Sequence, residues 1–169
     1  MIKMIIATDV RGGIGFQNKL PWCCPEDLQY FKEQTEGSTV VMGRNTWVSL
    51  QRLGMKNGLP ERINKVITSQ SKFLTGNMRK EHYISMGVVK NKLLRQAKFY
   101  GDEVFIMGGK SLYEQLFHLV DEVHHTTIKG DYECDTFVDT CMWEDNTNWF
   151  LDEVKTLSEV AEVKIWRKA

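Results

Sequence analysis

Two stretches of this chain share one pattern, in which an apolar strand is followed by glycine and then by the start of a helix. Residues 39–42 are followed by Gly43, and residues 103–107 are followed by Gly108 and Gly109. Continuous apolar runs of this length are typical of strands buried on both faces, as in parallel sheets. Because ligands of such sheets bind beyond the carboxyl ends of the strands, the pattern predicts an α/β fold with a site near these glycines.

The other apolar runs extend this prediction to the whole chain. We expect further strands over residues 1–9, 64–69 and 122–128, and helices over residues 25–35, 88–100 and 111–119 and directly after Gly43. Residues 150–157 and 160–167 alternate between apolar and polar side chains, which is typical of half-exposed antiparallel strands. Residues 82–84 and 135–138 are compatible with short strands, and residues 51–60 with a loop. The predicted fold is α/β with three layers: a mostly parallel central sheet, an antiparallel C-terminal edge and about four flanking helices.

Composition narrows the class of protein. The 169 residues are enough for a single domain, 1–169, with its own core. Lysine plus arginine equals aspartate plus glutamate, at 22 each, so no net charge attracts the protein to nucleic acid or to an anionic membrane. The N-terminal apolar run is too short for a signal peptide, and no uncharged run is long enough to span a bilayer. We therefore expect a cytoplasmic protein and, because no apolar stripe calls for a second copy, a monomer.

The cysteines and histidines do not predict a metal centre. The four cysteines, at positions 23, 24, 134 and 141, form no C-x-x-C pair, so we expect reduced thiols. His124 and His125 are neighbours in a predicted strand, where successive side chains point to opposite faces. We therefore expect that they do not share one ion.

The helix that begins at Pro25 carries the most informative acid of the chain. Proline suits the first turn of a helix, and the acids Glu26 and Asp27 suit the positive end of its dipole. Tyr30 and Phe31, three and four residues after Asp27, lie on the same helix face. If that face is buried, the carboxylate needs donors, which paired N–H groups of a ligand would supply. If it is exposed, Asp27 is an ordinary first-turn acid, and this stretch alone does not decide between the two.

Two further segments are compatible with a bound phosphate or a moving loop. Arg44 and Thr46 follow Gly43 at the start of a helix, where backbone N–H groups can bind a phosphate; an ordinary surface arginine is the alternative. Residues 11–19 contain three glycines but no G-x-G-x-x-G, so they form either a simple corner or a loop that closes over a ligand.

The order of several short motifs resembles the dihydrofolate reductase family over nearly all of the chain. The motifs are Ile14-Gly15, Leu20-Pro21-Trp22, Pro25-Glu26-Asp27-Leu28 with Phe31-Lys32, Met42-Gly43-Arg44-Asn45-Thr46-Trp47, Leu59-Pro60-Glu61-Arg62, and Gly108-Gly109-Lys110-Ser111-Leu112-Tyr113. The resemblance implies NADPH-dependent reduction of 7,8-dihydrofolate to tetrahydrofolate, by hydride transfer to pterin C6 and protonation of N5. Such an enzyme supports one-carbon and thymidylate metabolism and binds antifolates.

The resemblance also implies the residues that bind the substrate. Asp27 would bind the 2-amino group and a ring nitrogen of the pterin, stabilising its protonated or enol form while a water delivers the proton. Arg62 would pair with the α-carboxylate, and residues 12–24 would form a lid. The implied catalytic residues are Asp27, Trp22 and Leu20, and the implied substrate-binding residues are Ile5, Asp27, Leu28, Phe31, Leu50, Leu59, Arg62, Met107 and Thr126.

For the cofactor, the resemblance implies NADPH rather than NADH, because Arg44 and Ser69 match positions that bind the 2′-phosphate. An adenosine-binding subdomain would span about residues 38–106. The implied cofactor-binding residues are Ala7, Ile14, Gly15, Gly43, Arg44, Asn45, Thr46, Thr68, Ser69, Gly108, Gly109, Lys110, Ser111, Leu112 and Tyr113. No metal is implied.

Some residues depart from the family pattern, and two other functions compete. Cys23-Cys24 replaces a polar–aliphatic pair, His124 stands where tyrosine is common, and Met107 stands where a β-branched residue is common. The reductase of riboflavin synthesis shares the fold and NADPH but reduces a ribosyl sugar, and it normally lacks the Trp22-x-x-Pro25-x-Asp27 arrangement. A non-catalytic relative that keeps the fold as a scaffold is the second alternative.

Overall fold

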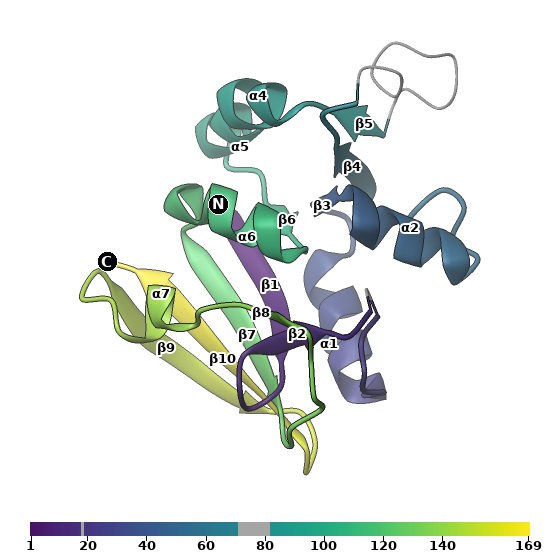
Figure 1. Cartoon of the computed structure of the whole chain (residues 1–169). Helices are drawn as coiled ribbons and strands as arrows, with labels where there is room; N and C mark the ends of the chain where they lie inside the picture. The colour runs from purple at the N-terminus through teal and green to yellow at the C-terminus, as the bar shows by residue number, and fades with distance from the viewer. Residues whose placement is uncertain (18, 71–81) are drawn as a thin grey trace.

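The computed structural model describes residues 1–17, 19–70 and 82–169 (Figure 1). Within these residues the main sheet has eight strands in the order β5-β4-β3-β6-β1-β7-β10-β9. The strands are β1 (Ile2–Thr8), β3 (Thr39–Gly43), β4 (Ile63–Ile67), β5 (Tyr83–Ile84), β6 (Val104–Ile106), β7 (Glu122–Ile128), β9 (Trp149–Thr156) and β10 (Ala161–Lys168). All neighbours from β5 to β7 pair in parallel, whereas β10 runs antiparallel to both β7 and β9. The predicted fold class is therefore confirmed.

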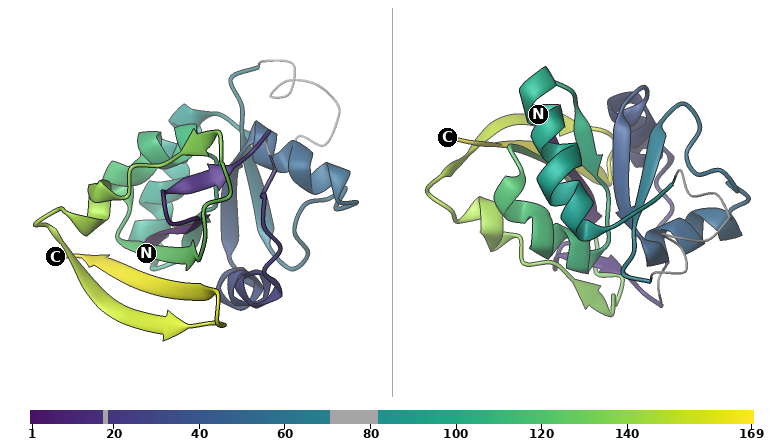
Figure 2. Two further views of the ribbon diagram at one scale, coloured as in Figure 1. Left: turned by 60° about the horizontal axis from the view of Figure 1, so that its bottom comes forward. Right: turned by 90° about the horizontal axis from the view of Figure 1, so that it is seen from above.

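The helices cover both faces of this sheet (Figure 2), and the two larger hydrophobic clusters lie between them and the sheet. They are α1 (Pro25–Thr35), α2 (Arg44–Arg52), α4 (Met86–Val88), the π-helical turn η1 (Val89–Leu93), α5 (Leu94–Tyr100), α6 (Lys110–Leu116), the 3-10 turn η2 (Phe117–Leu119) and α7 (Cys141–Glu144). In β1, Met4 and Ile6 pack with α5 and α6, whereas Ile5 packs with α1 and α2. This alternation follows from the period of two along a strand and produces three layers.

Most predicted elements agree with the structure, and the differences have local causes. The helix predicted at 25–35 has those bounds, and the helix predicted at 88–100 begins earlier, at Met86. The loop predicted at 51–60 is wrong for its first two residues, because α2 continues to Arg52 and the chain turns only at Gly54, whose φ is +86°. The weakly patterned stretch 70–86 lies partly outside the described residues. Among those described, no helix is long and apolar enough to cross a membrane.

A small second sheet connects two segments that are far apart in the sequence. Strand β2 (Gly13–Gly15) pairs antiparallel with β8 (Thr136–Phe137). The extended piece expected at 135–138 is thus confirmed, but the strand at 13–15 was not expected, because glycines are depleted in strands. The pairing places the start of the glycine-rich loop against the segment that follows β7.

His124 and His125 point to opposite faces of β7, as predicted. The ring of His124 contacts Tyr30 of α1, with 2.6 Å between Nδ1 and the tyrosine oxygen. The ring of His125 lies on the other side, with Nε2 2.8 Å from Thr8 Oγ1 and its centroid 5.4 Å from that of Trp143.

A buried acid, Glu122, makes the stability of the fold depend on pH. Burial alone would raise the pKa of Glu122, but His124, Lys3 and Arg167 lower it to about 2. A carboxyl group whose pKa is lower in the folded state stabilises the protein above its unfolded pKa, and this stabilisation is lost as the pH falls towards the folded pKa. We expect wild type to lose roughly 3 kcal/mol of unfolding free energy through this group between about pH 5 and pH 2.

Urea unfolding at a series of pH values measures this loss. Glu122→Gln is expected to be less stable at neutral pH, because Lys3 and Arg167 lose the carboxylate that they pair with, and to show a flatter dependence on pH below 5. Glu114→Gln is the matched control, because Glu114 is half-exposed and pairs weakly with Lys110 at 4.0 Å. Equal slopes for wild type and Glu122→Gln would contradict the assignment.

Candidate active site

Helix α1 begins as the sequence predicts, because proline and acids favour its first turn. Pro25 occupies the first helical position, and Glu26 and Asp27 follow. No side chain caps this end; the backbone N–H groups of Asp27 and Leu28 donate to the carbonyl of Cys24 at 3.1 Å. The turn therefore places Asp27 at the end of the helix nearest the carboxyl end of β1.

Asp27 lies against the sheet rather than in open solvent. Its residue is half-buried, and the hydroxyl of Thr126, which is 1% exposed on β7, forms a hydrogen bond with it. Burial raises the pKa of Asp27, and the hydrogen bond from Thr126 lowers it only in part. Of the two interpretations left open by the sequence, the structure therefore favours a carboxylate packed against the sheet over a fully exposed first-turn acid. A carboxylate has about four acceptor sites, so this contact leaves capacity for a ligand with N–H donors.

An apolar wall lies on the same face of the sheet as Asp27. Leu50 and Leu59 are buried in one cluster with Ile5, and Phe31 and Met107 pack against it. The structure thus brings together five of the side chains predicted to hold a flat ring system. Leu28, also predicted to hold the ring system, lies outside this cluster and is 58% exposed on α1. Leu20, predicted as a catalytic residue, is 54% exposed.

Arg62 is held in place by three oxygens of the protein. Its Nε donates to Thr35 Oγ1 at 3.1 Å, and its terminal nitrogens donate to the carbonyls of Pro60 at 2.7 Å and Lys32 at 3.4 Å. The guanidinium also lies 6.0 Å from the centroid of the Phe31 ring. The planar fork is therefore oriented at the edge of the apolar wall, where it could pair with a carboxylate.

The two predicted glycine corners meet at the ends of β3 and β6. The N–H of Gly43 donates to the carbonyl of Gly108 at 2.8 Å, and the peptide bond between Gly108 and Gly109 is cis. A Cβ at Gly108 would lie 3.4 Å from both Thr46 Oγ1 and the hydroxyl of Tyr113, and its φ of +129° also favours glycine. The corner is open on its outer side, because a Cβ at Gly109 would meet no atom within 4 Å.

The remaining predicted cofactor residues are spread over several elements. Arg44 starts α2, and its Nη1 donates to Gln70 Oε1 at 3.0 Å, while the N–H of Gln70 donates to Thr68 Oγ1 at 3.1 Å. Gln70, which sequence reasoning missed, therefore joins Arg44 to the end of β4. Asn45, Ser69, Lys110 and Ser111 are exposed, Ala7 and Ile14 are half-buried, and Gly15 and Leu112 are buried.

Comparison with known proteins assigns this arrangement to a family. The family model described as dihydrofolate reductase matches residues 1–162. The chain belongs to the dihydrofolate reductase family. It is 36% identical over 162 residues to dihydrofolate reductase type 9 of Escherichia coli, an alignment that covers 94% of this chain and 86% of that protein. It is 33% identical over 144 residues to dihydrofolate reductase of Staphylococcus aureus, with 85% and 81% covered.

A solved structure shows the same relationship in three dimensions. Dihydrofolate reductase from Enterococcus faecalis, complexed with NADP(H) and RAB-propyl, superimposes with a TM-score of 0.78 at 29% sequence identity. The alignment covers 99% of this chain and 96% of that chain. The resemblance stated from sequence motifs is therefore confirmed for family and fold.

In this chain, the loop between β1 and α1 is joined by hydrogen bonds and ring packing to the segment after β7. Asp9, which is 1% exposed, accepts hydrogen bonds from the N–H groups of Arg11 and Gly13 at 2.9 Å and of Tyr132 at 3.2 Å. The ring of Trp22 packs edge-on against Tyr132, with 5.4 Å between centroids. Neither Asp9 nor Tyr132 was singled out from the sequence, because the contacts of Tyr132 with Asp9 and with Trp22 join residues more than 100 positions apart.

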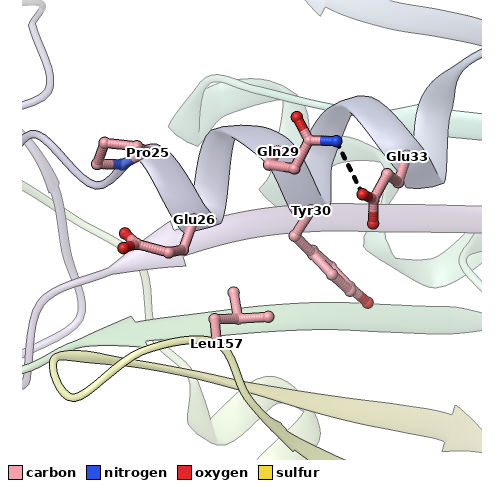
Figure 3. A pocket seen from close by; sticks show the side chains of 6 residues that line it. All are labelled: Pro25, Glu26, Gln29, Tyr30, Glu33 and Leu157. Carbon is pink, nitrogen blue, oxygen red and sulfur yellow. Dashed lines mark hydrogen bonds between the residues drawn. The ribbon is translucent and has the colours of Figure 1, made fainter.

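A groove between α1 and Leu157, which follows β9, is separate from this site (Figure 3). It is lined by Pro25, Glu26, Gln29, Tyr30, Glu33 and Leu157. Two of its residues are joined by a hydrogen bond of 2.8 Å from Gln29 Nε2 to Glu33 Oε1. Neither Asp27 nor the glycine corner lines this groove, so it is not the site predicted from the sequence.

Proposed function

We propose that this chain reduces 7,8-dihydrofolate to tetrahydrofolate with NADPH, by hydride transfer to pterin C6 and protonation of N5. One observation carries the proposal: Asp27 is half-buried, forms a hydrogen bond with Thr126 and lies beside the apolar wall that includes Leu50 and Leu59. The chain also belongs to the dihydrofolate reductase family.

Asp27 acts on the pterin by accepting its N–H donors. Burial makes the ionised carboxylate costly, so paired donors on a ring nitrogen and the 2-amino group are strongly favoured partners. A negative charge so placed stabilises a protonated or enol form of the pterin, which favours protonation of N5. Phe31, Leu50 and Leu59 bind the rings and exclude water, and Arg62 binds the α-carboxylate of the substrate.

The residues around the glycine corner fit a dinucleotide phosphate. Gly108 and Gly109 let a ligand approach the backbone, and Thr46 adds a hydroxyl beside Gly108. Arg44 and Ser69 carry donors suited to a 2′-phosphate, which favours NADPH over NADH. When bound, the nicotinamide supplies the hydride, and the protein's contribution is to hold the two rings in line.

A spectrophotometric assay tests the proposal. NADPH absorbance is expected to fall when dihydrofolate is added to the purified protein. Oxidation only with a ribosyl pyrimidine would select the riboflavin-type reductase, and no oxidation with either substrate would select a scaffold. Both of these results contradict the proposal.

Arg44 should determine the choice between the two nicotinamide cofactors. Arg44→Ala is expected to raise the KM for NADPH by about 10- to 100-fold, the loss of one charge-assisted contact, and to change the KM for NADH by less than about twofold. Arg52→Ala is the matched control, because Arg52 is exposed at the other end of the same helix. An equal rise for both cofactors would show that Arg44 acts on the fold and not on the 2′-phosphate.

A further inference from the structure

Helix α1 rests on the sheet through few buried side chains. Of its eleven residues, only Tyr30 and Thr35 are buried, and Leu28 is 58% exposed. A helix that buries so little apolar surface is positioned mainly by the contacts that those few side chains make. Tyr30 is therefore a principal determinant of where α1, and with it Asp27, lies.

Two side-chain contacts join α1 to β7: Asp27 pairs with Thr126, and Tyr30, one helical turn further along, pairs with His124. Asp27 and Tyr30 are three residues apart and share one face of the helix, and Thr126 and His124 are two residues apart and share one face of the strand. Thr126 forms a hydrogen bond with Asp27, and His124 Nδ1 lies 2.6 Å from the hydroxyl of Tyr30. Moving Tyr30 along or away from the strand would therefore change the contact between Asp27 and Thr126.

Glu122, His124 and Tyr30 form a series of hydrogen-bonded side chains, and Glu122 decides which nitrogen of His124 donates. Glu122 is ionised, since its pKa is about 2, so it accepts, and Nε2 of His124 carries the proton that it receives. The other ring nitrogen of His124, Nδ1, lies 2.6 Å from the hydroxyl of Tyr30, whose pKa is raised by burial. Tyr30 is thus hydrogen-bonded to one ring nitrogen of His124, while Glu122 holds the other ring nitrogen.

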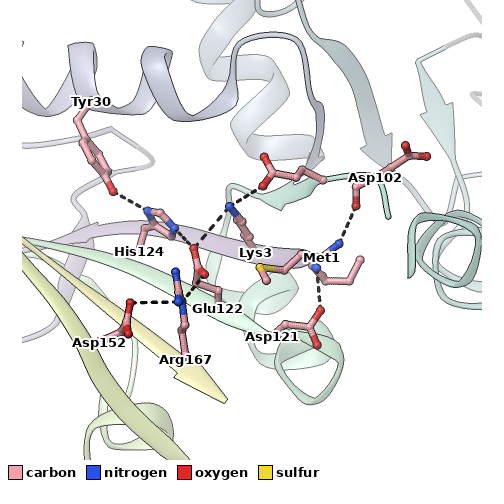
Figure 4. Close-up of polar contacts among 11 residues, drawn as sticks. Met1, Lys3, Tyr30, Asp102, Asp121, Glu122, His124, Asp152 and Arg167 are labelled. Carbon is pink, nitrogen blue, oxygen red and sulfur yellow. Dashed lines mark hydrogen bonds and ion pairs between the residues drawn. The ribbon is translucent and has the colours of Figure 1, made fainter. Parts of the chain in front are cut away.

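Glu122 is itself anchored from two other strands (Figure 4). Its carboxylate lies 3.6 Å from Lys3 Nζ of β1 and accepts a hydrogen bond from Arg167 Nε of β10 at 3.0 Å. Lys3 also pairs with Glu103 at 2.7 Å, and Arg167 pairs with Asp152 at 3.3 Å. The histidine is therefore held by a network that spans the sheet, and α1 contributes only Tyr30 to it.

Other charged groups face Tyr30 as well. Lys155 of β9 places its Nζ 6.0 Å from the centroid of the Tyr30 ring, and the charges of Glu122, Glu153 and Asp27 all act to raise the pKa of the phenol. None of these groups replaces His124 as the hydrogen-bond partner of the Tyr30 hydroxyl.

We propose that His124, fixed by Glu122, is a positioning residue for the reaction. Through Tyr30 it sets the position of α1, so that Asp27 meets both Thr126 and the pterin ring. The proposal rests on the proposed function for its effect on turnover. Its structural part, the coupling of His124 to Asp27 through Tyr30, does not depend on the identity of the substrate.

Tyr30→Phe is the sharpest test, because it keeps the ring and removes only the hydroxyl. We expect the KM for dihydrofolate to rise by about fivefold to tenfold, the loss of one hydrogen bond, and the pH profile of kcat/KM to shift. The Kd for NADPH should stay unchanged. His124→Gln should produce the same changes. The double variant should have the same KM for dihydrofolate as His124→Gln alone, because both substitutions remove the same hydrogen bond.

His125→Leu is the matched control for a merely structural effect. His125 is the adjacent buried histidine, and its bond to Thr8 lies on the opposite face of β7. The variant is expected to lower Tm without changing the KM for dihydrofolate or the pH profile. A Tyr30→Phe enzyme with the wild-type KM and pH profile would overturn the proposal.

A second measurement separates this proposal from the proposed function. The titration of the Asp27 carboxyl group, followed by carbon-13 NMR in the protein without ligands, should shift in Tyr30→Phe and stay unchanged in His125→Leu. If wild type does not oxidise NADPH with dihydrofolate, the proposed function fails, and the NMR titration still decides the coupling. An unchanged Asp27 titration in Tyr30→Phe contradicts the coupling whatever the activity.

Discussion

Asp27→Asn is expected to lower kcat for dihydrofolate by about 10²- to 10⁴-fold near neutral pH, the usual contribution of a positioned acid–base group. The amide keeps the size of the side chain and its place beside Thr126, but it removes the negative charge that stabilises a protonated pterin. NADPH binding, measured by fluorescence titration, should remain within about twofold of wild type, because the glycine corner does not include Asp27.

The rate of Asp27→Asn is also expected to depend on pH in a different way from the rate of wild type. Burial raises the pKa of Asp27, so in wild type the carboxylate forms fully only above its ordinary titration range. Without that charge the enzyme depends on substrate protonated by solvent, and its rate should rise continuously as the pH falls. Glu26→Gln is the control, since the adjacent Glu26 is exposed on α1. A wild-type rate in Asp27→Asn would remove Asp27 from the mechanism.

Gly13→Ala is expected to have the largest effect on stability. A Cβ at Gly13 would lie 2.5 Å from Cys134 Sγ, 2.6 Å from Cys134 Cβ and 3.0 Å from Asp9 Oδ1. Asp9 binds the backbone on both sides of this contact, so the neighbours cannot move away without breaking hydrogen bonds. Overpacking of this kind costs about 2–3 kcal/mol. We expect the Tm to fall by about 5–10 °C in a thermal scan.

Gly87→Ala is the matched control for this substitution. Gly87 lies in helix α4, and a Cβ there would meet no atom within 4 Å. Gly87 is in the first turn of the helix, after the N-cap Ser85, and alanine favours the helical conformation more than glycine, so the variant should be no less stable than wild type. A Gly13→Ala protein as stable as wild type would mean that β2 and the Asp9 region are loosely packed.

The packing around Gly13 and the position of α1 both depend on residues that are distant in sequence and close in space. Asp9 and Cys134 are joined by a contact of 3.6 Å across 125 positions, and Tyr30 and His124 by one of 2.6 Å across 94. A local pattern carries no information about such pairs. His124 was recognised from the sequence as a departure from the family, but its partners Tyr30 and Glu122 were not placed in the site.

The sequence by itself determined the local elements and the family. Apolar runs and their glycines predicted the parallel strands and the two corners at Gly43 and Gly108, and Pro25 with its acids predicted the start of α1 at the observed residue. These features depend on backbone preferences and on the period of side-chain burial, which neighbouring residues fix. The order of the motifs was enough to identify the dihydrofolate reductase family.

Only the tertiary structure decided the environment of the reacting groups. From the sequence, Asp27 could be either an exposed first-turn acid or a buried carboxylate, and its position against Thr126 of β7 settles this. Desolvation and side-chain hydrogen bonds arise where elements pack, so they are fixed by the register of α1 on the sheet and not by the residues of α1 alone. The same holds for Arg44, whose contact with Gln70 requires β3 and β4 to lie side by side.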